Sequence, residues 1–283
     1  MVKIKSLKGV DFDIIYEGFK KAFQDYEIQL NQDELKSMLL RRGFVPELSF
    51  AAFDKDEMVA FTLNGIGEFQ TKKTAYDTGT GTIETYRGRG LASQIFEYSI
   101  PYLKAAGVQH YLLEVLQHNT KAVSIYEKLG FKVSREFNYF VANQNDMKFD
   151  SIKPLNPIMI KQIDLNQCKT CSFEDFHSSW QNSFDAISRD PSRFIYLGAF
   201  KSEELVGFCI FEPSSGDITQ IGVNPSHRRQ GIGSHLLKEA LKFNRYDSIK
   251  VINTEIACES INKFMAYHSV PLSGKQFEMI RKI

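Results

Sequence analysis

The chain of 283 residues matches itself when it is shifted by 141 positions. In this register YRGRGLAS at 86–93 lies on HRRQGIGS at 227–234, so that Arg87 meets Arg228 and Gly90 meets Gly231. Three matches in one register, without a gap, predict two like domains in tandem. The other two matches are LLEV (112–115) with NTEI (253–256), and IYEKLGF (125–131) with AYHSVPL (266–272).

The repeat also predicts where the domains begin and end. Because the shift maps residue 142 onto residue 283, we expect a first domain at 1–142 and a second at 158–283. Residues 143–157, polar with two prolines, are expected to form the linker. Upstream, MVAFTL (58–63) matches LVGFCI (205–210) at an offset of 147, which predicts a hairpin-length insertion in the first copy, within 67–79.

Each copy has the pattern of an α+β fold. Two short apolar runs joined by a turn predict a pair of strands, and a third strand leads into the Arg/Gly turn. An amphipathic helix, a strand, a second helix and a final hairpin follow. Pro101 is expected to kink or end the helix of the first copy. We therefore expect in each domain a mixed, mostly antiparallel sheet flanked by helices.

Composition excludes several classes of protein. Hydrophobic residues make up 43% and charged residues 24%, as in globular proteins, and the formal net charge is +1. Such a balance does not favour nucleic-acid binding. No apolar run reaches the length of a signal peptide or of a membrane span. We expect a cytoplasmic protein without a membrane partner.

The four cysteines are too sparse for a disulfide framework in a chain of this length. Cys168 and Cys171 form a lone CKTC, and a structural zinc site would need a second pair of ligands at comparable spacing. We expect reduced thiols near the start of a helix and no metal cofactor. The other two are Cys209 and Cys258.

The Arg/Gly turn between a strand and a helix has two possible meanings. The N-terminus of a helix carries backbone N–H groups without intrahelical partners and a positive dipole end, which together favour an anion. Small residues at alternate positions, Gly90 and Ala92 or Gly231 and Gly233, would leave room for a diphosphate. The alternative is a surface turn with solvated arginines. A Walker loop is excluded because the GK[ST] sequence is missing.

These motifs together resemble the GNAT N-acetyltransferases. The run LEVLQHNTKAVSIYEKLGF (113–131) resembles the members that acetylate protein N-terminal amines. The second copy departs from the pattern, with Ser260, Lys263 and Pro271 where the first copy has Asn119, Ala122 and Gly130. The resemblance implies a splayed central strand pair, acetyl-CoA as cosubstrate and an amine acceptor. It implies the following cofactor-binding residues: Ile83, Glu84, Thr85, Arg87, Gly88, Arg89, Gly90, Leu91, Ala92, Ser93, Asn119, Tyr126, Ile221, Val223, Arg228, Arg229, Gly231, Ile232, Gly233 and Ser234.

Four residues are candidates for proton transfer. A phenol such as Tyr126, with a pKa of about 10, could protonate a departing thiolate of pKa about 8.5. A core aromatic is the alternative for Tyr126, and Tyr267 is its match in the second copy. The resemblance implies Glu114 as general base, and Asp217 lies roughly where other members keep an acidic base. A structural glutamate and a turn aspartate remain the alternatives.

We expect the first copy to carry the activity, because it retains the whole downstream motif. The acceptor is open among small amines, antibiotics, peptide termini and lysine. Its site is expected to be shaped by the N-terminal helices and the insertion 67–79, where Phe19, Phe23 and Tyr26 could form a wall or belong to the core. A non-catalytic acyl-CoA sensor or interaction protein is the alternative function. The assembly is expected to be a monomer with a pseudo-dimeric domain pair, or a homodimer.

Overall fold

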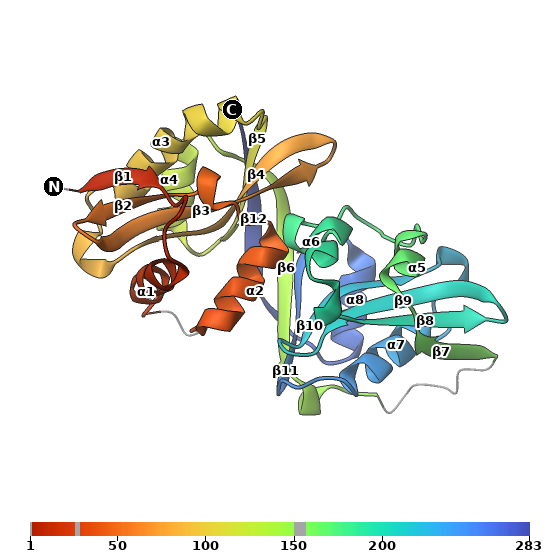
Figure 1. Cartoon of the computed structure of the whole chain (residues 1–283). Coiled ribbons are helices and arrows are strands. Elements are labelled where there is room, and N and C mark those ends of the chain that lie inside the picture. The colour runs from red at the N-terminus through yellow and green to blue at the C-terminus, as the bar shows by residue number, and fades with distance from the viewer. Residues whose placement is uncertain (1, 26–28, 150–156) are drawn as a thin grey trace. The chain divides into compact units, whose positions relative to one another are not determined.

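The computed structural model describes residues 2–25, 29–149 and 157–283 (Figure 1). Tyr26, one of the expected wall residues, lies outside the described residues. The chain divides into two compact units, Met1–Ser134 with Phe277–Ile283, and Arg135–Gln276. Each unit has a mixed sheet flanked by helices, so the expected tandem α+β architecture is confirmed.

The first unit has the strand order β1-β2-β3-β4-β5-β12. Its sheet is antiparallel from β1 to β4, and β4 and β5 are parallel. Its elements are β1 (Lys3–Ser6), α1 (Phe12–Ala22), α2 (Gln32–Arg42), β2 (Phe50–Asp54), β3 (Glu57–Phe69), β4 (Lys72–Thr82), α3 (Leu91–Ala105), β5 (His110–Leu116), α4 (Thr120–Lys128) and the end of β12 (Leu272–Lys282).

The second unit repeats this arrangement with the strand order β7-β8-β9-β10-β11-β6. Here too the sheet is antiparallel except for one parallel pair, β10 with β11. Its elements are most of β6 (Lys132–Asn143), β7 (Ile158–Gln162), α5 (Leu165–Lys169), α6 (Phe184–Arg189), β8 (Ile195–Lys201), β9 (Glu204–Glu212), β10 (Asp217–Val223), α7 (Ile232–Leu241), β11 (Ser248–Glu255) and α8 (Glu259–Tyr267).

The two copies exchange their last strands. The end of β12 completes the first unit, where Met279 is fully buried with the side chains of α3 and Ile283 donates its N–H to Gln109 O at 3.0 Å. Conversely, β6 pairs with β11 in the second unit, with Phe140 opposite Val251. The division therefore does not follow the expected boundary at residue 142. A sequence repeat shows which segments correspond, but not which core each segment completes.

The expected linker does not behave as a connector throughout its length. Its first part, 143–149, belongs to the second unit, where Met147 is buried and Phe149 packs against the same core. Residues 150–156 lie outside the described part of the chain.

The extra residues of the first copy lengthen the β3–β4 hairpin. β3 and β4 have 13 and 11 residues, whereas β9 and β10 have 9 and 7. Gln70 and Thr71, with φ of 48° and 63°, form the two-residue turn at its tip. The α3 helix continues past Pro101 to Ala105, so an end at the proline is wrong. Burial of Ile100 and Leu103 offsets the missing hydrogen bond.

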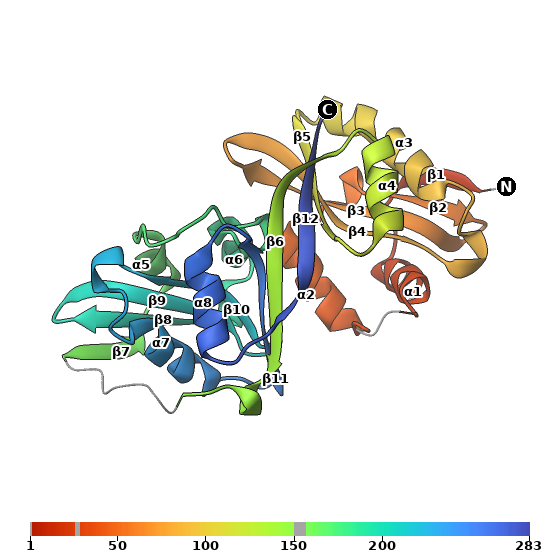
Figure 2. The ribbon, with the colours of Figure 1, turned by 180° about the vertical axis from the view of Figure 1, so that it is seen from behind.

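Two neighbouring parallel strands separate in each unit, as expected. β4 and β5 pair only from Thr74–Tyr76 with His110–Leu112, and β10 pairs with β11 only at Asp217 and Lys250. Beyond these pairs the strands diverge. Figure 2 shows α3 and α4 on one face of the first sheet and α7 and α8 on the matching face of the second. Each gap between the strands therefore lies beside the start of a helix.

The four cysteines are free thiols. Cys168 lies in the last turn of the short helix α5 rather than near its start, and burial raises its pKa to about 12. Within residues 2–25, 29–149 and 157–283, no three His, Cys, Asp and Glu side chains are grouped so that they could hold a metal ion.

Candidate active site and its counterpart in the second copy

Both Arg/Gly turns end on a glycine in the left-handed region. Gly90 has a φ of 71° and Gly231 a φ of 88°, and each is the N-cap of the following helix, α3 or α7. Neither helix receives a side-chain cap. The backbone N–H groups of the first helical turn are therefore presented for an anion, as the sequence predicts. They belong to Leu91, Ala92 and Ser93 in the first copy and to Ile232, Gly233 and Ser234 in the second.

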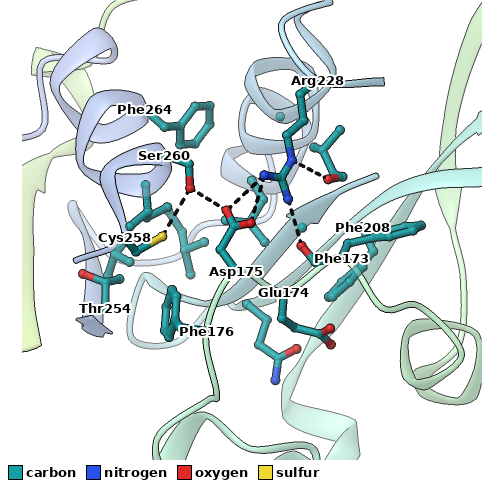
Figure 3. Close-up of a pocket in the computed structure, with 18 of the residues that line it drawn as sticks. Phe173, Glu174, Asp175, Phe176, Phe208, Arg228, Thr254, Cys258, Ser260 and Phe264 are labelled. Atoms are coloured by element: carbon teal, nitrogen blue, oxygen red, sulfur yellow. Dashed lines mark hydrogen bonds and ion pairs between the residues drawn. The ribbon is translucent and has the colours of Figure 1, made fainter. Parts of the chain in front are cut away.

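The first arginine of each turn braces the turn through its guanidinium group. The Nε of Arg228 donates to Val223 O at 2.9 Å, its Nη1 lies 2.9 Å from the Asp175 carboxylate, and its Nη2 donates to Phe173 O at 3.2 Å (Figure 3). Arg87 makes the matching contacts with Thr82 O, Asp25 and Ala22 O at 3.1–3.2 Å. These guanidinium groups thus tie the turn to the preceding strand and to a segment that precedes β2 or β8, and their binding of phosphate stays a prediction.

The second arginine of each turn is exposed. Arg89 stacks on the ring of Tyr86 at 4.5 Å and donates to Thr85 O at 2.9 Å. Arg229 has a φ of 63°, the conformation that Gly88 adopts at the matching position. Arg89 and Arg229 are thus exposed cations near the helix starts for which the structure records no ion pair among the described residues.

Backbone geometry identifies which N–H groups face the gap between the parallel strands. Asn224 donates its N–H to Val206 O on β9. Because successive residues of a strand point to alternate sides, the N–H groups of Val223 and Ile221 point away from β9 and toward the gap. The sequence reasoning chose these two residues as donors to a carbonyl.

In the first copy, the backbone N–H groups that face the gap lie earlier in the chain than the expected residues 83–85. Ile83 donates its N–H to Val59 O at 3.0 Å, as Asn224 does in the second copy, and Glu84 and Thr85 begin a short 3₁₀ helix. By the same alternation, the backbone N–H groups of Thr82 and Thr80 point away from β3 and toward β5. The N–H of Ile83, one of the expected donors, is therefore engaged by β3, because the strand continues to Thr82 before the turn begins. The expectation for Glu84 and Thr85 stays a prediction.

The first copy brings a carboxylate and a phenol together beside this gap. The Tyr126 hydroxyl donates to Asp77 Oδ2 at 3.2 Å. The same carboxylate accepts the Thr80 hydroxyl at 2.8 Å and the Gly79 N–H at 2.9 Å. Burial raises the pKa of Asp77, and these hydrogen bonds partly oppose the rise. A carboxyl group with a raised pKa is suited to exchange protons.

Asp77 was missed because the sequence comparison assigned residues 67–79 to the insertion. The signal that could have found it is the shift of 141, which extends further upstream than expected. Thr78 and Thr219, 141 residues apart, are each the extra residue of a β-bulge. In this register Asp77 matches Ile218, and Asp217 matches Tyr76.

Glu114 and Asn119 have local partners in the first copy. The Tyr76 hydroxyl hydrogen-bonds the Glu114 carboxylate, and the pKa of Tyr76 is raised well above its usual value, first by burial and then by this neighbouring charge. Asn119 is the N-cap of α4, where its side chain accepts the Ala122 N–H at 3.2 Å. The capping role expected for Asn119 is therefore present.

The expected catalytic residues of the second copy are not brought together. Asp217 is 1% exposed and is not among the residues that line the cavity of its own unit. Tyr267 is 55% exposed and lies at the cavity rim, and Ile218 takes the position of Asp77. Glu255, the match of Glu114, is ion-paired with Arg135 at 3.0 Å.

The second unit nevertheless contains a large cavity, of 650 Å³, beside the start of α7. Ile221, Val223, Arg228, Arg229, Gly231, Ile232, Gly233 and Ser234 all line it. The expected cofactor-binding residues of this copy thus gather around one space. Figure 3 shows Asp175 reaching across the cavity, where it accepts the Ser260 hydroxyl at 2.5 Å and pairs with Arg228.

Phe19 and Phe23, two of the aromatic residues expected at an acceptor wall, belong to the core of the first unit. Phe19 is buried, with its ring 4.6 Å from Phe23 and 5.9 Å from Phe61. Phe23 packs against the same core.

Separated strands beside an uncapped, glycine-initiated helix form a site suited to a ligand that carries a phosphate group. The model of the acetyltransferase (GNAT) family matches residues 12–131 and 162–259. The chain therefore belongs to the GNAT acetyltransferase family, whose members use acetyl-CoA.

Individual relatives support N-acetyltransferase activity. N-alpha-acetyltransferase 30 of Schizosaccharomyces pombe is 29% identical over 127 residues, which cover 43% of this chain and 85% of that protein. N-alpha-acetyltransferase MAK3 of Arabidopsis thaliana is 28% identical over 137 residues, 46% of this chain and 72% of that protein. A solved tandem GNAT protein from the clavulanic acid biosynthesis pathway has a TM-score of 0.75 and 11% identity, covering 100% of this chain and 98% of that chain. That likeness shows the fold.

The helices were compared with the length and hydropathy that a membrane span needs. In the described ranges, none of them is both long and apolar enough to cross a membrane.

Proposed function

We propose that the first copy transfers an acetyl group from acetyl-CoA to a primary amine, by direct attack within a ternary complex. The observation that carries this proposal is the hydrogen bond of 3.2 Å between the Tyr126 hydroxyl and Asp77 Oδ2 beside the separated strands β4 and β5. The matching positions of the second copy hold Ile218 and an exposed Tyr267.

The cofactor would lie along the gap between the strands. Its diphosphate would accept hydrogen bonds from the backbone N–H groups at the start of α3, and Arg89 would be the nearby cation. Its thioester carbonyl would accept the backbone N–H groups of Thr80 and Thr82, which point toward the gap. Donors of this kind stabilise the negative charge that develops on the carbonyl oxygen during attack, and removing one typically costs about 10²-fold or more in rate.

Asp77 is the base that we assign to the reaction. A chain-terminal amine has a pKa of about 8 and is largely protonated at neutral pH, so that a nearby carboxylate must accept its proton before attack. The neutral amine then attacks the thioester carbon and the C–S bond breaks. Tyr126 protonates the departing thiolate, and the attacking nitrogen gives its second proton to solvent water as the amide forms. The proton held by Asp77 returns to Tyr126 along their hydrogen bond, which restores both groups.

Glu114 was the base expected from the sequence, and its carboxylate is engaged by the Tyr76 hydroxyl. We propose that it positions the site rather than accepting the proton. If this is correct, Asp77→Asn removes most of the activity and the acid limb of the pH–rate profile. Glu114→Gln lowers the rate but keeps that limb.

The acceptor that we propose is the α-amino group of a peptide. The two relatives described above are N-alpha-acetyltransferases, and the first copy resembles such enzymes in the run 113–131. This class also fits a carboxylate base, because an α-amino group loses its proton more readily than a lysine side chain does.

The test is an assay of thiol release from acetyl-CoA with short peptides, and the same peptides with a blocked N-terminus as control. Tyr126→Phe should lower kcat about 10²-fold or more, whereas Tyr267→Phe, the matched change, should keep wild-type turnover. Loss of turnover in Tyr267→Phe instead would assign the chemistry to the second copy. Equal rates with free and blocked peptides would rule out the α-amino acceptor.

A further inference from the structure

The fully buried part of the cavity wall in the second unit is uncharged. The charged lining residues are the exposed Glu174, Asp175, Arg229, Glu259 and Lys263 and the half-buried Arg228, which pairs with Asp175. None of the described lining residues that are buried carries a charge. These buried residues are Ser179, Asn182, Phe208, Ile218, Thr219, Gly222, Ile232, Ser234, Val251, Asn253, Thr254 and Cys258.

The second copy lacks the carboxylate that lies beside Tyr126 in the first copy. Ile218 occupies the position of Asp77 and is 1% exposed. An isoleucine cannot accept a proton from an ammonium group, and it offers no partner to the hydroxyl of Tyr267. An amine acceptor would therefore find no carboxylate at the position of Asp77. The lining carboxylates of Asp175 and Glu259 are ion-paired with Arg228 and Lys263, so that the cavity is suited to hold a ligand rather than to transfer a group.

The apolar part of the wall is closely packed. Phe208 and Val251 are 1% and 4% exposed, and the rings of Phe173 and Phe208 lie 6.3 Å apart. A Cβ atom at Gly222 would come within 3.0 Å of the Phe208 ring and 3.1 Å of Phe173 Cβ. The glycine thus lets two aromatic rings approach the strand, beside the N–H groups that face the gap.

We infer that the second copy binds, without transferring its acyl group, a coenzyme A thioester whose acyl chain is longer than acetyl. This inference rests on the proposed function in one respect, that a coenzyme A thioester is the ligand of this fold. The diphosphate would lie at the start of α7, and the acyl chain would contact Phe208, Ile218 and Val251. Each fully buried methylene group contributes about fourfold in affinity, so two of them favour the longer chain by at least about tenfold.

The chain provides its own reporter for this site. Its single tryptophan, Trp180, is buried in the second unit, one residue from Ser179 and two from Asn182, which line the cavity. Acetyl-CoA and hexanoyl-CoA are titrated against the full chain, with Trp180 fluorescence to locate binding and calorimetry to count sites. We expect hexanoyl-CoA to bind the second site at least about tenfold more tightly than acetyl-CoA.

Two variants make the result specific. Ile218→Asp should abolish the preference for hexanoyl-CoA, whereas the conservative Ile218→Val should keep it within about fourfold. Thermal unfolding of both variants checks that they fold. In the Asp77→Asn protein, hexanoyl-CoA should still bind, yet thiol release from it should stay at background.

The outcomes separate the two proposals. Equal affinities for the two thioesters, or calorimetry that detects no hexanoyl-CoA at the second site, would overturn this inference even if the first copy acetylates peptides. Thiol release from hexanoyl-CoA in Asp77→Asn would overturn the absence of transfer. Failure of peptide acetylation, with hexanoyl-CoA still bound at the second site, would refute the proposed function alone.

Discussion

Replacing Asp77 with asparagine separates the activity of the first copy from its stability. Asp77 Oδ1 accepts the Gly79 N–H at 2.9 Å, and Oδ2 accepts the hydroxyls of Thr80 and Tyr126 at 2.8 and 3.2 Å. An asparagine of the same shape keeps the first bond. Its amide nitrogen can donate to both hydroxyls, because each hydroxyl also has acceptor lone pairs. The variant therefore keeps its hydrogen-bond partners but cannot accept a proton.

We expect a large loss of activity and a small change in stability. A positioned base contributes about 10²–10⁴-fold to the rate, so kcat/KM should fall by that factor. Each rearranged hydrogen bond changes the free energy of unfolding by about 1 kcal/mol at most, and part of that loss is offset because a buried charge is removed.

The pH dependence of stability gives a second, independent readout. Burial raises the pKa of Asp77, so the folded state binds this proton more tightly than the unfolded state, where the pKa is about 3.9. The contribution of Asp77 to stability is therefore fully present below pH 3.9 and is lost as the pH rises through its folded pKa. The asparagine variant has no carboxyl group to ionise at this position. Its free energy of unfolding should therefore rise relative to that of the wild type as the pH increases from 4 to 7.

Urea unfolding at several pH values and thiol-release kinetics measure these two effects. The matched control is Asp217→Asn in the second copy, which should leave kcat/KM unchanged. The reasoning is refuted if Asp77→Asn retains more than about a tenth of the wild-type kcat/KM. It is also refuted if the stability difference between variant and wild type shows no dependence on pH.

Three further predictions concern the second unit. Arg228→Ala removes three contacts of the guanidinium and should lower the free energy of unfolding by about 2–3 kcal/mol in urea titrations; a change below about 0.5 kcal/mol would contradict the bracing role. Burial lowers the pKa of His268, so stability should fall as the pH drops below about 6.5, the unfolded pKa, and a scan of Tm against pH should lose this slope in His268→Gln. Burial also raises the pKa of Cys168 to about 12 and that of Cys209 further, so iodoacetamide should label the partly exposed Cys171 first; early labelling of Cys209 would be inconsistent with its burial.

The sequence predicted the parts of this protein that depend on local pattern. The shift of 141, the glycine at each helix start and the hairpin insertion are visible in residue order, and all have the expected structural counterparts. Glycine is informative here because a φ of 71° or 88° is strained for most other residues, so Gly90 and Gly231 mark the two turns without any tertiary information.

The parts that were missed depend on contacts between distant segments. The sequence did not show that Arg87 and Arg228 brace the turns, because their partners Asp25 and Asp175 lie more than 50 residues away in the chain. Asp77 was missed because the self-comparison of the chain does not fix where the inserted residues lie within 67–79. A β-bulge, which decides the side to which a side chain points, leaves no strong mark in the sequence.

The exchange of strands has a consequence for how the protein is made. A ribosome produces residues 277–283 only after all of 135–276, so the first sheet lacks its neighbour to β5 until the second unit has been synthesised. During that interval β5 is an unpaired edge that could pair with another chain. Slow translation or a late frameshift would then expose the first copy to aggregation although its own coding region is intact.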